Sequence, residues 1–184
     1  DPADTDPARL LEGIAAALAR VQPLPESLTR HLGRPCVAIE AALLPAMVQA
    51  FWTDAEPLVL LLDEVQVLDG TPALEALAWL VRHLPERIRM VLSSRPVPAL
   101  PIRRLALDGR VLELRSVDLA LSGSAIAAMA ERLGRPLAHE EAQQVATVTD
   151  GWAAAAVVAL TLPDPTSLSG GATAMAAYLR EQVL

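Results

Sequence analysis

The fold of this chain is decided by one short stretch, Leu58–Glu64, which reads LVLLLDE. Its apolar run, Leu58–Leu62, follows Pro57 and ends at a carboxylate. A continuous apolar run of this kind is typical of a strand buried on both faces of a parallel sheet. Because open α/β sheets bind ligands at the carboxyl ends of their strands, we predict an α/β fold with functional residues at Asp63 and Glu64.

The same pattern is typical of a Walker B strand, whose two carboxylates hold Mg²⁺ and align the water that attacks the γ-phosphate of a nucleotide. We expect Asp63 to coordinate Mg²⁺ through water. We expect Glu64 to polarise the attacking water, as general base or as positioning group. The alternative is that the pair is only the polar start of a loop, since an acid after apolar residues is common.

The phosphate-binding partner of this motif, a G-x-x-x-x-G-K-[ST] loop, is absent from the sequence. Every basic residue is Arg and no Lys occurs, so the lysine that grips phosphate is missing. Either the loop lies upstream of Asp1 in a longer parent protein, or the chain is a degenerate fold that kept the acidic half only. A piece of a longer chain is the expectation, because the sequence starts at Asp rather than Met and shows no signal peptide.

Composition narrows the class of protein. The 184 residues, 53% of them apolar, suffice for one domain with a core and a small satellite domain. The apolar stretches are shorter than the roughly 18 residues that span a bilayer, so we expect a soluble protein without membrane contact. The net charge of −7 argues against direct nucleic-acid binding by this segment, which needs clustered basic residues.

Cysteine and histidine usage gives no sign of a metal site. Cys36 has no CxxC motif or Cys/His cluster around it, which favours a buried apolar role in a reducing compartment, the cytoplasm. The histidines are far apart and share no ligand spacing; they are His31, His83 and His139.

Apolar periodicity predicts helices and strands in the first part of the chain. The predicted helices span Pro7 to near Pro23, Ile39–Trp52 with a kink at Pro45, and Pro72–Leu84. Ile88–Leu92 and Arg110–Leu114 are further candidate strands. Strand, helix and strand with short connections form a βαβ unit, whose strands are parallel.

After Ser116 the pattern is helical only. The predicted helices are Ser122–Leu133, Leu137–Val148, Trp152–Leu162 and a last one from Thr173. We therefore divide the chain into a partial nucleotide-binding α/β core (1–116), a helical subdomain (117–162), a Pro-, Ser- and Gly-rich linker (163–172) and the start of another domain (173–184).

Arg95 strengthens the prediction of a nucleotide site. It follows the second predicted strand directly, in the sequence SSRP at 93–96. If the two strands are adjacent, its guanidinium lies near Asp63, where it can sense or stabilise γ-phosphate charge. Ser93 and Ser94 could donate hydrogen bonds at the same edge. The alternative is an exposed arginine in a Pro-rich loop.

The order of these motifs resembles the ATPase module of the STAND class, and is most similar to the large ATP-binding LuxR-type transcriptional regulators exemplified by the maltose-regulon activator. The resemblance covers the whole chain. It rests on LVLLLDE at 58–64, HLP at 83–85, MVLSSRP at 90–96, LEL at 112–114 and TDGWA at 149–153. The family more often has Asp-Asp where this chain has Asp63-Glu64, and its first strand, Walker A loop and second strand would all precede Asp1.

The resemblance implies an ATP switch. Its fold is a P-loop NTPase-like parallel sheet, here without the first strand and P-loop, followed by an α-helical lid. Mg²⁺ and ATP are held between core and lid, and ATP with an inducer permits self-association and transcription activation. Arg95 matches the sensor arginine. Asp150, Gly151 and Trp152 match the segment that approaches the base or ribose, and 173–184 resembles the opening of a winged-helix domain.

The resemblance also implies that the parent regulator is an ATPase, that its other domains are the partners of this segment, and that this chain alone is inactive. A competing hypothesis is an ATPase-like interaction or oligomerisation module without catalysis. A metabolic kinase or hydrolase has little support, because no nucleophile and base pair is visible. Without the central strand of the sheet we expect exposed strand edges, and hence a partner chain, rearranged strands or marginal stability.

Overall fold

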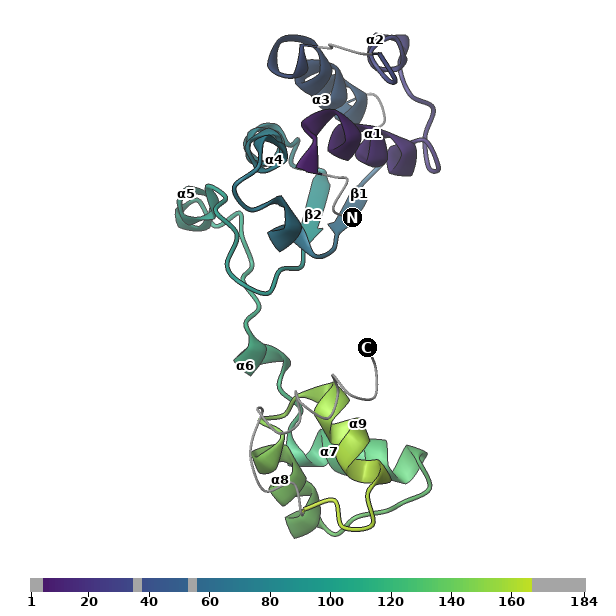
Figure 1. Cartoon of the computed structure of the whole chain (residues 1–184), viewed down its shortest axis with the longest axis vertical. Helices are drawn as coiled ribbons and strands as arrows, with labels where there is room; N and C mark the ends of the chain where they lie inside the picture. Colours follow the sequence, from purple (N-terminus) through teal and green to yellow (C-terminus); the bar gives the residue numbers. More distant parts are fainter. Residues whose placement is uncertain (1–4, 35–37, 53–55, 167–184) are drawn as a thin grey trace. The chain divides into compact units, whose positions relative to one another are not determined.

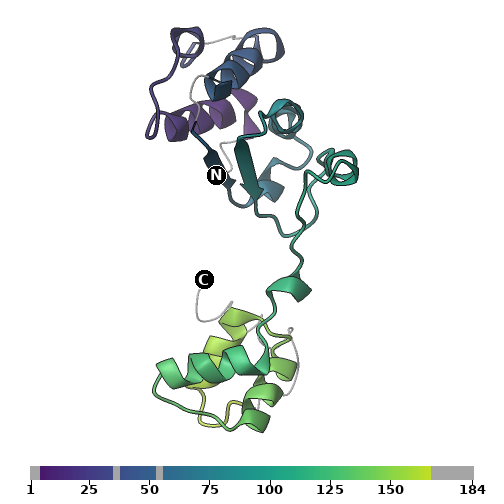
Figure 2. The same ribbon diagram turned by 180° about the vertical axis from the view of Figure 1, so that it is seen from behind.

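The computed structural model describes residues 5–34, 38–52 and 56–166. The chain divides into two compact units, on either side of the bond between Val111 and Leu112. Figure 1 shows both units, and Figure 2 shows them from behind. Each unit is described by itself. Cys36 and the predicted helix from Thr173 lie outside the described residues.

The first unit combines helices with a small parallel sheet. In chain order its elements are α1 (Pro7–Leu18), α2 (Glu26–Thr29), η2 (Ile39–Leu43), α3 (Leu44–Trp52), β1 (Leu58–Leu62), η3 (Val65–Leu68), α4 (Pro72–His83), β2 (Ile88–Leu92) and α5 (Ile102–Leu107). Side chains from α1, α3, α4 and the sheet form one hydrophobic core.

Helix α1 begins as its sequence predicts. The Asp6 carboxylate accepts the Ala8 N–H at 2.9 Å, and Pro7 occupies the first turn, where its missing N–H costs nothing. The residues that α1 buries recur at helical spacing, which places one face on the core; they are Leu10, Leu11, Ile14, Ala15 and Leu18. The helix ends at Leu18, earlier than the predicted end near Pro23.

The predicted helix Ile39–Trp52 is broken near Pro45, as expected. A π-helical segment, η2, runs from Ile39 to Leu43, and α3 starts at Leu44. Proline has no N–H to donate and its ring crowds the carbonyl of the preceding turn, so it fits the first turn of a new helix better than the interior of a long one.

Strands β1 and β2 pair in parallel, and α4 connects them, so the predicted βαβ unit is confirmed. The register runs from Leu58 opposite Ile88 to Leu62 opposite Leu92. Figures 1 and 2 both show the two strands side by side, with α4 near β2. The carboxyl ends of both strands therefore meet at one edge of the sheet.

The sheet is buried on one face only, which corrects the prediction of a strand buried on both. Leu60 and Ile88 lie in the core. On the other face Val59, Leu61 and Val91 are 54%, 71% and 50% exposed. Within the described ranges no helix covers this face, so its apolar side chains meet solvent although their sequence is that of a fully buried strand.

The third predicted strand, Arg110–Leu114, is wrong for this structure. The segment is irregular, and Leu112 and Leu114 are 84% and 59% exposed. Among the described residues only β1 and β2 form a sheet. A strand needs a neighbour that satisfies its backbone hydrogen bonds, and no described strand pairs with this segment.

The second unit is helical. It contains α6 (Ser116–Leu119), α7 (Gly123–Arg132), α8 (His139–Val148) and α9 (Ala153–Thr161). Its small core consists of Ile126, Ala142, Val145, Ala146, Ala156 and Ala159. The Ser122 hydroxyl accepts the Ala125 N–H at 3.3 Å and caps α7, which begins one residue after the predicted start. No helix in the described part of the chain combines the length and apolarity needed to cross a membrane.

Candidate functional site

Backbone pairing continues past both strands and brings their polar ends together. The Ser93 N–H donates to the Leu62 carbonyl at 3.0 Å, and the Val65 N–H donates to the Ser93 carbonyl at 2.9 Å. These bonds hold the residues after β1 beside those after β2. We call the side chains gathered there the carboxylate cluster; it consists of Asp63, Glu64, Gln66, Ser93 and Arg95.

Asp63 is held by two donors. Its Oδ1 accepts the Ser93 hydroxyl and, at 2.9 Å, the Glu64 N–H. No hydrogen bond to Oδ2 is found among the described residues. A carboxylate fixed in this way keeps one oxygen for a further partner. The prediction that Ser93 donates at this edge is confirmed.

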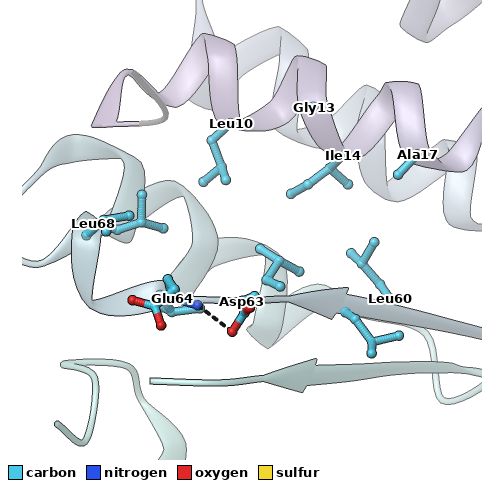
Figure 3. Close-up of a pocket in the computed structure, with 12 residues that line it drawn as sticks. Leu10, Gly13, Ile14, Ala17, Leu60, Asp63, Glu64 and Leu68 are labelled. Atoms are coloured by element: carbon cyan, nitrogen blue, oxygen red, sulfur yellow. Dashed lines mark hydrogen bonds between the residues drawn. The ribbon is translucent and has the colours of Figure 1, made fainter. Parts of the chain in front are cut away.

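Glu64 leaves β1 in a left-handed conformation, with φ 55° and ψ 42°. For a residue other than glycine this costs about 1–2 kcal/mol, and such outliers are common where a side chain must be aimed. The turn ends the strand and starts η3. Figure 3 shows Asp63 and Glu64 at the end of β1, with the Glu64 N–H directed at Asp63.

Arg95 reaches the carboxylates that follow the first strand, and its ion pair is with Glu64, the residue after Asp63. The Nη2 of Arg95 lies 3.7 Å from the Oε2 of Glu64. The two side chains are 82% and 51% exposed, and exposed pairs are worth about 0–1 kcal/mol. The pair therefore brings the two residues together without locking them.

Gln66 was missed by the sequence analysis. Its Nε2 donates to the Oε2 of Glu64, and its Oε1 accepts the Arg95 N–H at 3.2 Å. The only sequence feature that could have indicated its role is its position, two residues after the pair Asp63-Glu64. Ser94, named with Ser93 as a possible donor, does not join the cluster, since its Oγ is buried without a hydrogen-bond partner.

A cavity of about 200 Å³ lies between α1 and the end of β1. Leu10, Ile14 and Ala17 project into it from α1, above Leu60 (Figure 3). Asp63 and Glu64 line one end. Ligand pockets measure about 300–1,000 Å³, so this mostly apolar cavity is too small for a nucleotide.

The oxygen atoms of the carboxylate cluster are suitable ligands for a hard cation, but they are too few to bind one alone. Carboxylate and hydroxyl oxygens are the ligands that Mg²⁺ prefers, usually with several waters and with substrate phosphates. No group of three or more His, Cys, Asp or Glu suited to a metal occurs within 5–34, 38–52 and 56–166. The cluster therefore fits a Mg²⁺ ion that brings other ligands, and does not form a cage of protein ligands.

The predicted base- or ribose-binding residues, Asp150, Gly151 and Trp152, lie in the second unit and close the turn between α8 and α9. Gly151 has φ 66°, and its N–H donates to the Ala146 carbonyl at 2.9 Å. Its carbonyl accepts the Leu121 N–H at 2.8 Å. The side chains of Asp150 and Trp152 are exposed on either side of this turn.

Comparison with known proteins gives a distant likeness. No protein-family model matches the chain. The chain is 29% identical over 139 residues to the HTH-type transcriptional regulator MalT of Yersinia pestis (strain Pestoides F). The same figures apply to MalT of Yersinia enterocolitica serotype O:8 / biotype 1B. The matched region is 70% of this chain and 15% of the relative. The likeness supports a distant relation to a transcriptional regulator.

Proposed function

We propose that this chain is the Walker B and sensor half of a STAND-type nucleotide-binding module, with its helical lid, in a longer ATP-dependent transcriptional regulator. The observation that supports this most is the meeting of Asp63, Glu64 and Arg95 at one edge of a parallel sheet. Two separate strands deliver them, and Glu64 and Arg95 are 3.7 Å apart. The likeness to MalT is consistent with such a parent.

The geometry is consistent with a separate role for each of these residues. Asp63, with Oδ1 taken up by Ser93 and Glu64, offers Oδ2 to a Mg²⁺ ion through water. When bound, that ion neutralises phosphate charge. Glu64 orients the attacking water. Arg95, which is 82% exposed, is free to turn from Glu64 toward the γ-phosphate and to sense its presence.

In this proposal the residues that bind the nucleotide phosphates lie outside this chain. No Lys is present, and the cavity beside the carboxylates, at about 200 Å³, is too small for ATP. The parent therefore supplies the phosphate-binding loop. In this account Asp150, Gly151 and Trp152 approach the base or ribose from the lid, with Gly151 shaping the turn and its two neighbours offering side chains.

The partners of the segment are the other domains of the parent regulator, and ATP favours self-association of that protein in the cytoplasm. With a net charge of −7, this segment leaves DNA binding to another domain.

A second candidate function is an ATPase-like interaction module without catalysis. The observation that favours it is the bare sheet face, where Val59, Leu61 and Val91 are at least half exposed. A module of this kind uses the face to bind a partner and has no need of ATP.

Calorimetry distinguishes the two. We expect the full-length parent to bind Mg²⁺-ATP and the isolated chain to show no binding heat under the same conditions. Absence of binding by the parent as well would favour the interaction module. Tight binding by the isolated chain would mean that the phosphate site has been misidentified.

A further inference from the structure

Gln66 joins two residues of the carboxylate cluster that come from different strands. Its Nε2 donates to the Glu64 carboxylate, and its Oε1 accepts the Arg95 main-chain N–H at 3.2 Å. Because an amide has one donating and one accepting end, these two bonds decide which end faces Glu64. Gln66 thus ties the carboxylate after β1 to the backbone after β2.

Gln66 is less exposed than Glu64 and Arg95, the two residues that it joins. It belongs to η3, where Val65 and Leu68 are each 2% exposed and packed in the core. The side chains of Glu64 and Arg95 are 51% and 82% exposed, and an exposed ion pair restrains such side chains weakly. The amide of Gln66 is therefore the main restraint on the direction of the Glu64 side chain.

The two hydrogen-bonding groups of Glu64 are held separately. Its backbone N–H donates to the Oδ1 of Asp63 at 2.9 Å, within its left-handed turn. Its side-chain Oε2 is taken by Gln66 and faces Arg95. Over the described residues, no hydrogen bond to Oε1 is found, so one carboxylate oxygen stays open.

We propose that Gln66 is a positioning residue for nucleotide hydrolysis: it fixes the Glu64 carboxylate so that Oε1 meets the attacking water, and it fixes the backbone that carries Arg95. The inference rests on the proposed function. A neutral amide holds the carboxylate without adding charge. Misplacing a reacting group by about 1 Å can cost about 100-fold in rate, so a residue that only directs Glu64 has a measurable effect.

Replacing Gln66 by methionine or by glutamate, which are nearly the same size, separates its bond to Glu64 from its bond to the Arg95 N–H. Gln66→Met removes both hydrogen bonds. Gln66→Glu keeps an acceptor for the Arg95 N–H but sets a second carboxylate against Glu64. Gln144→Met is the matched control, because Gln144 is an exposed glutamine on α8 in the second unit.

The first measurement is amide hydrogen exchange by NMR on the 184-residue chain. The Arg95 amide exchanges several-fold faster in Gln66→Met than in the unmodified chain, and stays slow in Gln66→Glu and Gln144→Met, because only Gln66→Met removes its acceptor. Unchanged exchange of Arg95 in Gln66→Met would overturn the link between Gln66 and the second strand.

The second measurement is single-turnover ATP hydrolysis by the full-length parent. Gln66→Met slows hydrolysis about tenfold, and Gln66→Glu at least as much, while ATP affinity stays within about twofold, since the effect falls on orientation and not on binding. Gln144→Met hydrolyses at the unmodified rate. If Gln66→Met hydrolyses normally while Glu64→Gln does not, the inference is wrong and the proposed function stands. If Glu64→Gln also hydrolyses normally, the proposed function fails and the inference with it.

Discussion

Gly151 combines a left-handed backbone with a close approach to another segment of the second unit. Its φ is 66°, and an added Cβ would lie 2.7 Å from the Leu121 nitrogen. Gly134 has φ 73° but nothing within 4 Å of an added Cβ. Gly134→Ala should therefore cost about 1 kcal/mol from backbone strain alone. Gly151→Ala should cost at least about 2 kcal/mol, because the segment at Leu121 must also move.

Chemical denaturation of the two variants, followed by a probe in the second unit, tests this difference. Equal losses in the free energy of unfolding would mean that the close approach of Gly151 to Leu121 is not formed. The glycine of the TDGWA sequence at 149–153 would then not be required by the geometry of this turn.

Arg135 binds the end of α9. Its guanidinium donates to the carbonyls of Leu160 at 2.9 Å, of Pro163 at 2.6 Å and of Leu162. The last carbonyls of a helix lack partners within it, so a cation there satisfies them and also meets the negative end of the helix dipole. Arg135→Ala should cost about 1–3 kcal/mol.

The control for Arg135 is Arg132→Ala, since Arg132 is an exposed arginine in the last turn of α7. That change should cost at most about 1 kcal/mol, from the helix dipole alone. Thermal unfolding measured by circular dichroism compares the two. A midpoint for Arg135→Ala that is no lower than that of Arg132→Ala would contradict the account.

Most residues of the carboxylate cluster could be predicted from the sequence alone. Asp63 and Glu64 are marked by the apolar run before them, and Arg95 by its place after the next apolar run. The contribution of Gln66 depends on hydrogen bonds to one residue that follows each strand. The exact partner of Arg95 depends on the left-handed turn at Glu64. Neither a cross-strand bond nor a turn conformation leaves a periodic pattern in the sequence.

At the level of elements, β1 offers a sharp test of which face is buried. Leu60 is 8% exposed and its neighbour Leu61 is 71% exposed. Leu60→Thr should cost about 2–4 kcal/mol, because it removes core contacts and buries a hydroxyl. Leu61→Thr should change stability by less than about 0.5 kcal/mol.

Urea unfolding of the isolated chain measures the change in the free energy of unfolding for Leu60→Thr and for Leu61→Thr. Similar losses for the two variants would mean that both faces are covered and that the sheet face carrying Leu61 is not bare. Under the proposed function, further elements of the module cover that face in the full-length parent, and we expect Leu61→Thr to cost more there.

Elements whose formation depends on local pattern were predicted well. The helices α1, α4, α7 and α8 follow from apolar spacing and end signals, and β1 and β2 follow from short apolar runs between prolines and polar residues. The segment Arg110–Leu114 also carries three apolar residues but forms no strand. A strand depends on a neighbour as well as on its own residues, and that neighbour cannot be read from the segment.

For the molecule as a whole, the bare sheet face predicts association in solution. Val59, Leu61 and Val91 are apolar and at least half exposed. Among the described residues neither strand has a second neighbour in the sheet, and this combination favours pairing with other chains. We expect the isolated chain to show concentration-dependent growth in sedimentation velocity, and the double variant Leu61→Thr/Val91→Thr to reduce it. Monomeric behaviour of the unmodified chain at high concentration would refute this prediction.

The central claim is that Asp63, Glu64 and Arg95 form the hydrolytic and sensing half of an ATP site. The most direct measurement is single-turnover hydrolysis of ATP by the full-length parent, with and without Glu64→Gln. The account predicts that Glu64→Gln lowers the rate at least about 100-fold, because a group that positions or deprotonates water contributes that much, while ATP remains bound. Hydrolysis at the unmodified rate in Glu64→Gln would contradict it.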